Sequence, residues 1–380
     1  MSKTMPIAPV FFLPVPLFVQ FWGGPKGTAI LRLIERETGV SIGISDKTLR
    51  KNLLEYPVKA PTKSMQGKLA RWIEKLTENP RLKLIVEFGF RQLWGMRTGE
   101  ADWRGMLYGL SNSSGGALFS QTISYLKQIL DEESAYYKKA RNYKDQPAEL
   151  LECLYQEPFY YRYGLPIPDQ LLAEATRESP SDPIQHLMKQ KMIAHSLMHG
   201  CISLQMDILA CAEVEWLSEN LSAEPEESRY RSILGQILPA PMDDGESVTT
   251  PVEMYFIQVR KDFGYESWHD MAEYVPMDAG AEADIESKRR KLVDWTQAKR
   301  LPKVEVVDEF LESLIHRRGD YDPIYYQLLY PAAAFIERLL QLFLPGIQKL
   351  ELSVEDVAAM FGTFHEHFER HKKAAILKSE

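Results

Sequence analysis

Histidines spaced four residues apart are the side chains of this chain whose types and spacing could do chemistry. His195 and His199 lie in a segment with helical apolar periodicity, so their imidazoles share one face and could ligate zinc. His186 precedes them, and Asp207 and Glu213 follow as further ligand types. No HExxH sequence is present, and histidines on an apolar helix usually pack in a core or an interface. We therefore expect no metal and no cofactor.

Two other polar groups could serve as acid, base or ligand. His367 and His371 repeat the spacing of four near a charged C-terminal end, where we expect a solvated helix face. Asp243 and Asp244 lie in a proline-rich stretch, residues 239–251, where nothing fixes the geometry that acid–base catalysis needs. We assign no catalytic residue to either group, and the whole chain leans away from an enzyme.

Motifs for nucleotide binding and nucleophilic catalysis are absent. The sequence contains no GxxxxGK[ST], no GxGxxG after a strand, no GxSxG and no CxxC. The aromatic run 159–163 (FYYRY) could stack single-stranded bases, but core packing at a helix–turn corner is favoured. Three widely separated cysteines argue against a disulfide framework and for a reducing, cytoplasmic compartment.

The elements that must position these residues have the helical period. Leu, Ile, Val, Met and aromatic residues recur at i, i+3 and i+4, and sustained period-2 alternation is scarce. We predict an all-α fold, with helices at 28–38, 66–78, 117–131, 183–220, 251–263, 284–296, 303–316, 322–343 and 353–373. The helix at 183–220 begins with Ser181-Asp182-Pro183, a capping residue followed by a first-turn proline.

A basic helix–loop–helix pattern occurs twice. When Pro61 is set on Pro302, each copy has a helix rich in Lys and Arg, a short basic loop ending in proline, and an amphipathic helix. Basic helices are predicted at 45–54 and 287–296, and we expect each proline to suit the first turn of the helix after it. The polar residues that we expect to contact nucleic acid are Lys47, Thr48, Arg50, Lys51 and Asn52 in the first copy, and Lys288, Arg289, Arg290, Lys291, Lys299, Arg300 and Lys303 in the second.

The two copies resemble the second half of helix-turn-helix domains of the Cro and lambda-repressor type. The resemblance covers about 50 residues around the first copy (28–76) and about 65 around the second (251–314). It implies that 45–54 and 287–296 are recognition helices for a major groove. Residues 31–40 and 263–272 would then supply the preceding helix and turn. The loop glycine of that family is absent from both copies, with Val58, Ala298 or their neighbours in its place.

Charge and composition suggest three parts. Residues 1–110 carry 17 Lys and Arg against 9 Asp and Glu, although the whole chain has a net charge of −8. An anionic partner for this end is expected, as is phosphate-dominated, salt-dependent binding. Polar stretches rich in serine, glycine or proline are typical of linkers. Their positions predict a basic module at 1–110, a helical middle at 117–240 and a C-terminal helical module at 250–380.

The apolar stretch from Ile7 to Trp22 contains Pro9, Pro14 and Pro16, and it is too short to span a membrane. We expect it to be extended and tucked against the body of the protein, with binding of a protein partner as the alternative. The sequence thus favours a DNA-binding regulator or adaptor that acts in transcription, a mobile element or phage defence. A helical scaffold subunit of a larger assembly is the alternative, supported by surface-capable aromatics such as Tyr325 and Tyr326.

Overall fold

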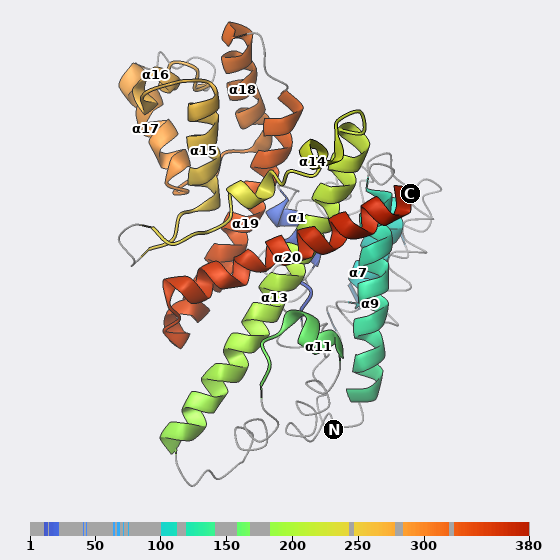
Figure 1. Ribbon diagram of the computed structural model, residues 1–380. Helices are drawn as coiled ribbons and strands as arrows, with labels where there is room; N and C mark the ends of the chain where they lie inside the picture. The colour runs from blue at the N-terminus through green and yellow to red at the C-terminus, as the bar shows by residue number, and fades with distance from the viewer. Residues whose placement is uncertain are drawn as a thin grey trace. The chain divides into compact units, whose positions relative to one another are not determined.

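The structure is a computed structural model that describes residues 11–13, 15–22, 41, 43, 64, 67–68, 71, 75, 100–111, 119–140, 158–167, 183–242, 247–277, 284–318 and 323–379. Every regular element among these residues is a helix (Figure 1), and the β-pairing among them is one isolated antiparallel bridge between Pro241 and Val248. The predicted all-α class is therefore confirmed.

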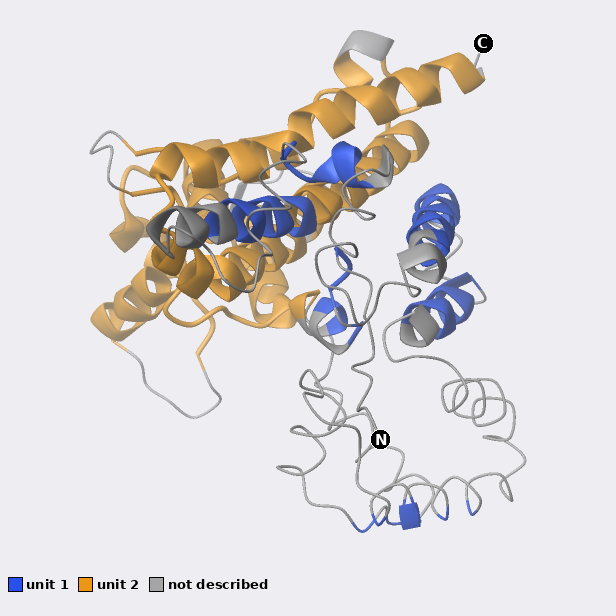
Figure 2. Ribbon diagram, turned by 90° about the horizontal axis from the view of Figure 1, so that it is seen from below, with its two compact units in different colours: residues 1–20, 24–201 blue, residues 21–23, 202–380 orange. Residues whose placement is uncertain are grey.

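The chain divides into two compact units (Figure 2). One unit contains residues 1–20 and 24–201, and the other contains residues 21–23 and 202–380. The boundary lies within the long helix α13 (Pro183–Asn220), between Cys201 and Ile202. The division into three parts by composition remains a prediction.

The first unit contains α7 (Glu100–Ser111), α9 (Ser120–Ala140) and α11 (Pro158–Tyr163). Helix α7 packs on α9, where Arg104 forms an ion pair of 2.7 Å with Asp131. The sequence pattern predicted the first part of α9 and missed α7. Of the segment expected to form a helix at 66–78, the described residues 67, 68, 71 and 75 are helical.

The apolar N-terminal segment differs from the expectation. It forms a short helix, α1 (Val15–Phe21), because Pro16 falls in the first turn, where the missing N–H of proline would be unpaired anyway. Before this helix, Phe11, Phe12 and Leu13 are buried, as expected for a segment tucked against the body. The Leu13 carbonyl accepts a hydrogen bond of 2.8 Å from Trp103 Nε1.

The second unit is built around α19 (Pro323–Leu350), whose segment from Ala332 to Ile336 is fully buried. Among the described elements of this unit, α19 packs most extensively on α15 (Pro251–Asp262) and α18 (Val304–Arg318), and it also contacts the short 3-10 helix η4 (Leu234–Gln236). The remaining helices are α14 (Glu226–Arg229), α16 (Trp268–Ala272), α17 (Ile285–Thr296) and α20 (Val354–Ser379).

In the part of the chain that the structure describes, two helices have the length and hydropathy of a membrane span. They are the Lys191–Asn220 part of α13 and the Leu328–Leu350 part of α19, whose most apolar windows are 78% and 56% buried inside the protein. The core helix of a soluble protein passes the same test, so these two helices are weak evidence for a membrane.

Candidate nucleic-acid interface

The second copy of the basic pattern folds as four helices, α15 to α18, which lie together in Figure 1. Side chains cap three of the four at the N-terminus. Thr250, Ser267 and Asp284 accept hydrogen bonds from the backbone N–H groups of Glu253, Asp270 and Ser287, respectively. Such caps satisfy donors that a helix start leaves unpaired, so the local sequence fixes where α15, α16 and α17 begin.

One face of α17 is buried against its neighbours. Leu292 is fully buried, and Trp295 packs between Phe256 of α15 and Phe310 of α18, with ring centroids 6.1 Å and 6.0 Å away. Helix α17 also contacts α16, the helix before it. The predicted recognition helix at 287–296 thus exists as a helix with one packed side, beginning at Ile285.

The loop after α17 contains a residue in a left-handed backbone conformation. Ala298 has a backbone φ of +52°, which is the left-handed region that favours glycine. Its N–H donates to the Trp295 carbonyl at 3.0 Å, and the Lys299 N–H donates to the Asp294 carbonyl at 3.0 Å. These two bonds form a Schellman motif, the commonest glycine-ended helix stop. The chain makes the turn typical of such a loop with alanine at the left-handed position.

Pro302 lies before α18 rather than in its first turn. The helix begins at Val304, so the proline is two residues upstream, and the expectation of a first-turn proline was wrong for this copy. Pro302 is buried, and its carbonyl accepts a hydrogen bond of 2.7 Å from the Tyr330 hydroxyl. This bond attaches the basic loop to α19.

Five of the seven basic residues predicted in this copy are exposed. They lie on α17 and in the loop that follows: Arg289, Arg290, Lys299, Arg300 and Lys303. Between residues 285 and 303 the chain has seven basic residues and two acidic ones, Glu286 and Asp294. An exposed cationic strip of this kind can bind phosphate groups. We call these five residues the basic strip.

The other two predicted basic residues bind the protein's own backbone. Lys288 Nζ donates to the Glu273 carbonyl at 2.8 Å, and Lys291 Nζ donates to the Pro276 carbonyl at 2.6 Å. Lys291 also lies 5.6 Å from the centre of the Trp295 ring. Both lysines are half-buried. Their placement indicates that they position the connection between α16 and α17.

An acidic residue begins the exposed face of α17. Glu286 accepts a hydrogen bond of 2.8 Å from Arg289 and lies 4.0 Å from Arg290. The hydrogen bond from Arg289 lowers the pKa of Glu286, so this carboxylate is ionised at neutral pH. The residues predicted for the first copy, Lys47 to Asn52, and the Asp243–Asp244 pair lie outside the described residues.

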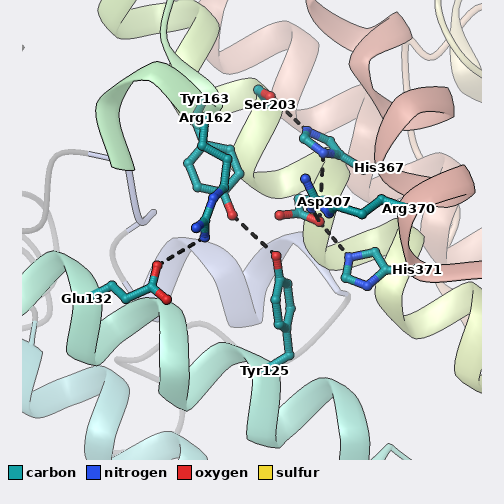
Figure 3. Close-up of polar contacts among 9 residues, drawn as sticks. All are labelled: Tyr125, Glu132, Arg162, Tyr163, Ser203, Asp207, His367, Arg370 and His371. Carbon is teal, nitrogen blue, oxygen red and sulfur yellow. Dashed lines mark hydrogen bonds and ion pairs between the residues drawn. The ribbon is translucent and has the colours of Figure 1, made fainter. Parts of the chain in front are cut away.

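His199 has a structural partner, since its Nδ1 lies 2.9 Å from the Tyr163 carbonyl. Among the described residues, no group of three or more His, Cys, Asp or Glu side chains could hold a metal ion. In the aromatic run, Tyr160 and Tyr163 are buried and Tyr161 is 51% exposed. The Tyr163 hydroxyl lies 3.5 Å from that of Tyr125, and Arg162 forms an ion pair of 3.0 Å with Glu132 (Figure 3).

The C-terminal histidines were wrongly expected on a solvated face. His367 is 4% exposed, and its Nε2 lies 2.9 Å from the Ser203 hydroxyl. His371 Nε2 lies 2.7 Å from an oxygen of Asp207, and Arg370 donates to the same oxygen (Figure 3). Asp207 is fully buried on α13, which also carries Ser203, whereas His367, Arg370 and His371 lie on α20. These two helices therefore meet across a buried ionic cluster.

The charges of this cluster determine the state of Asp207. Burial alone would raise the pKa of its carboxyl, but the hydrogen bond from His371 and the charges of His367 and Arg370 outweigh burial. The pKa of Asp207 is therefore well below its usual range. Ser203, His367 and Asp207 form a chain of polar contacts like that of a nucleophilic triad. However, the Asp207–His367 distance is 3.9 Å and Ser203 is 1% exposed, so the serine is not available to a substrate.

Glu213 is a second buried carboxylate on α13. It accepts hydrogen bonds from the N–H of Leu234 at 2.8 Å and from the Ser232 hydroxyl at 2.9 Å. Burial raises the pKa of Glu213 to about 7 despite these bonds. Its contacts hold the start of η4, which explains its burial without a metal-binding role.

Comparison of the chain with known protein families, with curated proteins and with solved structures found no match.

Proposed function

We propose that this protein is a cytoplasmic regulator or adaptor that binds double-stranded DNA through α17 and the loop after it. The observation that carries the proposal is the basic strip, whose five cationic side chains are exposed while the opposite face of α17 is packed by Leu292 and Trp295. The order of a helix, a connection, a basic helix, a left-handed turn and a further helix resembles a helix-turn-helix domain.

A duplex-binding titration at several salt concentrations tests the proposal. Five phosphate contacts predict a plot of log affinity against log salt with a slope of about −4.5, or roughly a 500-fold loss between about 50 and about 200 mM salt. Arg290→Ala should weaken binding and reduce the slope by about 1. Lys373→Ala is the matched control, because it removes one exposed positive charge from α20. Absence of duplex binding by the full chain at low salt would overturn the proposal.

A second candidate is an interaction subunit of a larger assembly. The observation that favours it is the exposure of Leu342 and Leu344, at 40% and 43%, on the apolar helix α19. Tyr326, which the sequence placed among surface-capable aromatics, is instead buried and bonds to Asp262 at 2.9 Å. The test is size-exclusion chromatography of native lysate. A complex that Leu342→Lys disrupts supports this candidate, and a lone monomer contradicts it.

A further inference from the structure

The exposed face of α17 contains one feature that phosphate binding alone does not explain. Residues 286, 289, 290, 293 and 297 share this face by helical spacing, and its first member, Glu286, is acidic. The side chains of Glu286, Arg289 and Arg290 are 44%, 48% and 76% exposed. A carboxylate at one end of a phosphate-binding surface, beside two of its arginines, repels the ligand and would weaken binding to any duplex.

Glu286 makes only a small contribution to stability. Its ion pairs with Arg289 and Arg290 are solvent-exposed and screened, and such pairs contribute little to folding. As an acidic residue in the first turn, Glu286 interacts favourably with the helix dipole, but the N-cap of α17 is Asp284, two residues earlier, so Glu286 is not required as the capping group. Its position also places its carboxylate beside the two arginines of the exposed face.

The two arginine side chains are placed differently around the Glu286 carboxylate. Glu286 holds the guanidinium of Arg289 at hydrogen-bond distance, whereas Arg290 is 4.0 Å away and mostly exposed. A guanidinium matches the O6 and N7 acceptors of guanine, and a carboxylate accepts from the N4 amino group of cytosine. The Glu286–Arg289 pair thus presents an acceptor and a fork of donors side by side, which is a pattern that base edges can match and phosphates cannot.

We propose that Glu286 and Arg289 are specificity-determining residues that read a cytosine and a neighbouring guanine in the major groove, while Arg290 and the loop residues of the basic strip bind phosphate. With Arg289 on a base, four phosphate contacts remain, and the expected salt slope changes from about −4.5 to about −3.6. This inference rests on the proposed function of α17. It predicts that removing the charge of Glu286 changes which sequence is bound, and not simply how tightly duplexes are bound.

The test is selection from a duplex library with a randomised centre, using the full chain. Wild type should enrich a sequence with an adjacent cytosine and guanine. Glu286→Gln keeps the shape and removes the charge, and an amide prefers adenine. Discrimination for cytosine should therefore fall about tenfold or more, while binding to unselected duplexes strengthens. Arg289→Ala should lose the guanine preference. Arg290→Ala should weaken binding equally for all sequences.

Glu355→Gln is the matched control, since it removes one exposed negative charge from the first turn of α20. It should leave the selected sequence unchanged. An identical selected sequence for wild type and Glu286→Gln, with duplex binding intact, would overturn this inference and leave the proposed function standing. If wild type binds no duplex at low salt, the proposed function itself fails. Circular dichroism melts of each variant confirm that the fold is retained.

Discussion

Asp207 is a buried carboxylate that is paired with Arg370 and His371 of a helix about 160 residues later in the chain. Asp207→Asn removes the charge while His367, Arg370 and His371 remain around it. Breaking a buried ion pair by removing one partner costs about 3–5 kcal/mol, and we expect the lower end because Arg370 is 44% exposed. Urea unfolding measures this loss. Asp131→Asn is the matched control at an exposed ion pair and should cost less than about 1 kcal/mol.

The stabilisation that Asp207 provides should depend on pH. The pKa of Asp207 is lower in the folded protein than in the unfolded chain, so its stabilising effect is complete above the unfolded value of about 3.9. As the pH falls below about 4, the unfolded chain takes up the proton first, and this stabilisation is lost. The difference in unfolding free energy between wild type and Asp207→Asn should therefore shrink between about pH 5 and about pH 3. A constant difference over this range would contradict the assignment.

The backbone conformation of Ala298 predicts an unusual effect of a glycine substitution on stability. A non-glycine residue in the left-handed region destabilises the folded protein by about 1–2 kcal/mol. Glycine removes this strain, but its greater freedom stabilises the unfolded chain and offsets part of the gain. We expect Ala298→Gly to raise the free energy of unfolding by about 0.5–1 kcal/mol. Ala374→Gly, at an exposed position within α20, should lower it by about 1 kcal/mol. Equal losses for both variants in chemical denaturation would argue against strain at Ala298.

At the scale of elements, the Phe11 ring of the N-terminal segment packs closely on helix α13 at Gly200. A Cβ added to Gly200 of α13 would lie 2.3 Å from a ring carbon of Phe11. Gly200→Ala should therefore destabilise the protein by about 1–3 kcal/mol, as overpacking does. In the background of Phe11→Leu the penalty should disappear, because alanine favours the helix by about 1 kcal/mol once the ring is gone. Thermal melts of the four members of this cycle measure the coupling, and additive effects would exclude the contact.

The sequence predicted elements where apolar period and capping agree. Helices at 183–220 and 284–296 match α13 and α17 closely because a first-turn proline marks one start and Asp284 caps the other. Helix α7 was missed although its buried side chains Trp103 and Leu107 have helical spacing, and α1 was missed because three prolines argued against any helix. The third, Pro16, falls in the first turn of α1, where a helix accepts proline.

The candidate site was predictable only in part, for a physical reason. Basic density at 288–303 located α17 and its loop, but residue type does not distinguish an exposed arginine from a lysine that binds a carbonyl. Lys288 and Lys291 turn back to Glu273 and Pro276, residues that a long connection separates from them in sequence. In the same way, the spacing of His367 and His371 gave no sign of Asp207. Long-range partners are absent from a local pattern.

At the scale of the whole molecule, two basic copies in one chain predict cooperation on a single duplex. If both copies bind, linking them raises affinity through effective concentration. Arg50→Ala and Arg290→Ala should then each weaken binding to a long duplex by tenfold or more. On a duplex that is long enough for one copy alone, only one of the two variants should lose affinity. Fluorescence anisotropy with duplexes of two lengths measures this. Loss confined to Arg290→Ala at both lengths would assign binding to α17 alone.

The burial of Phe11 has a consequence for the ribosome-bound chain. The Phe11 N–H bonds to Glu133, and its ring rests on Gly200, which is added about 190 residues later, or roughly 10–40 s at ordinary synthesis rates. Phe12 and Leu13 gain Trp103 as a partner about 90 residues after they are made, whereas the ring of Phe11 lacks Gly200 for the full interval. The nascent chain therefore leaves the Phe11 side chain incompletely packed for longer than Phe12 or Leu13, and this side chain is the one that we expect the cell's folding machinery to protect longest.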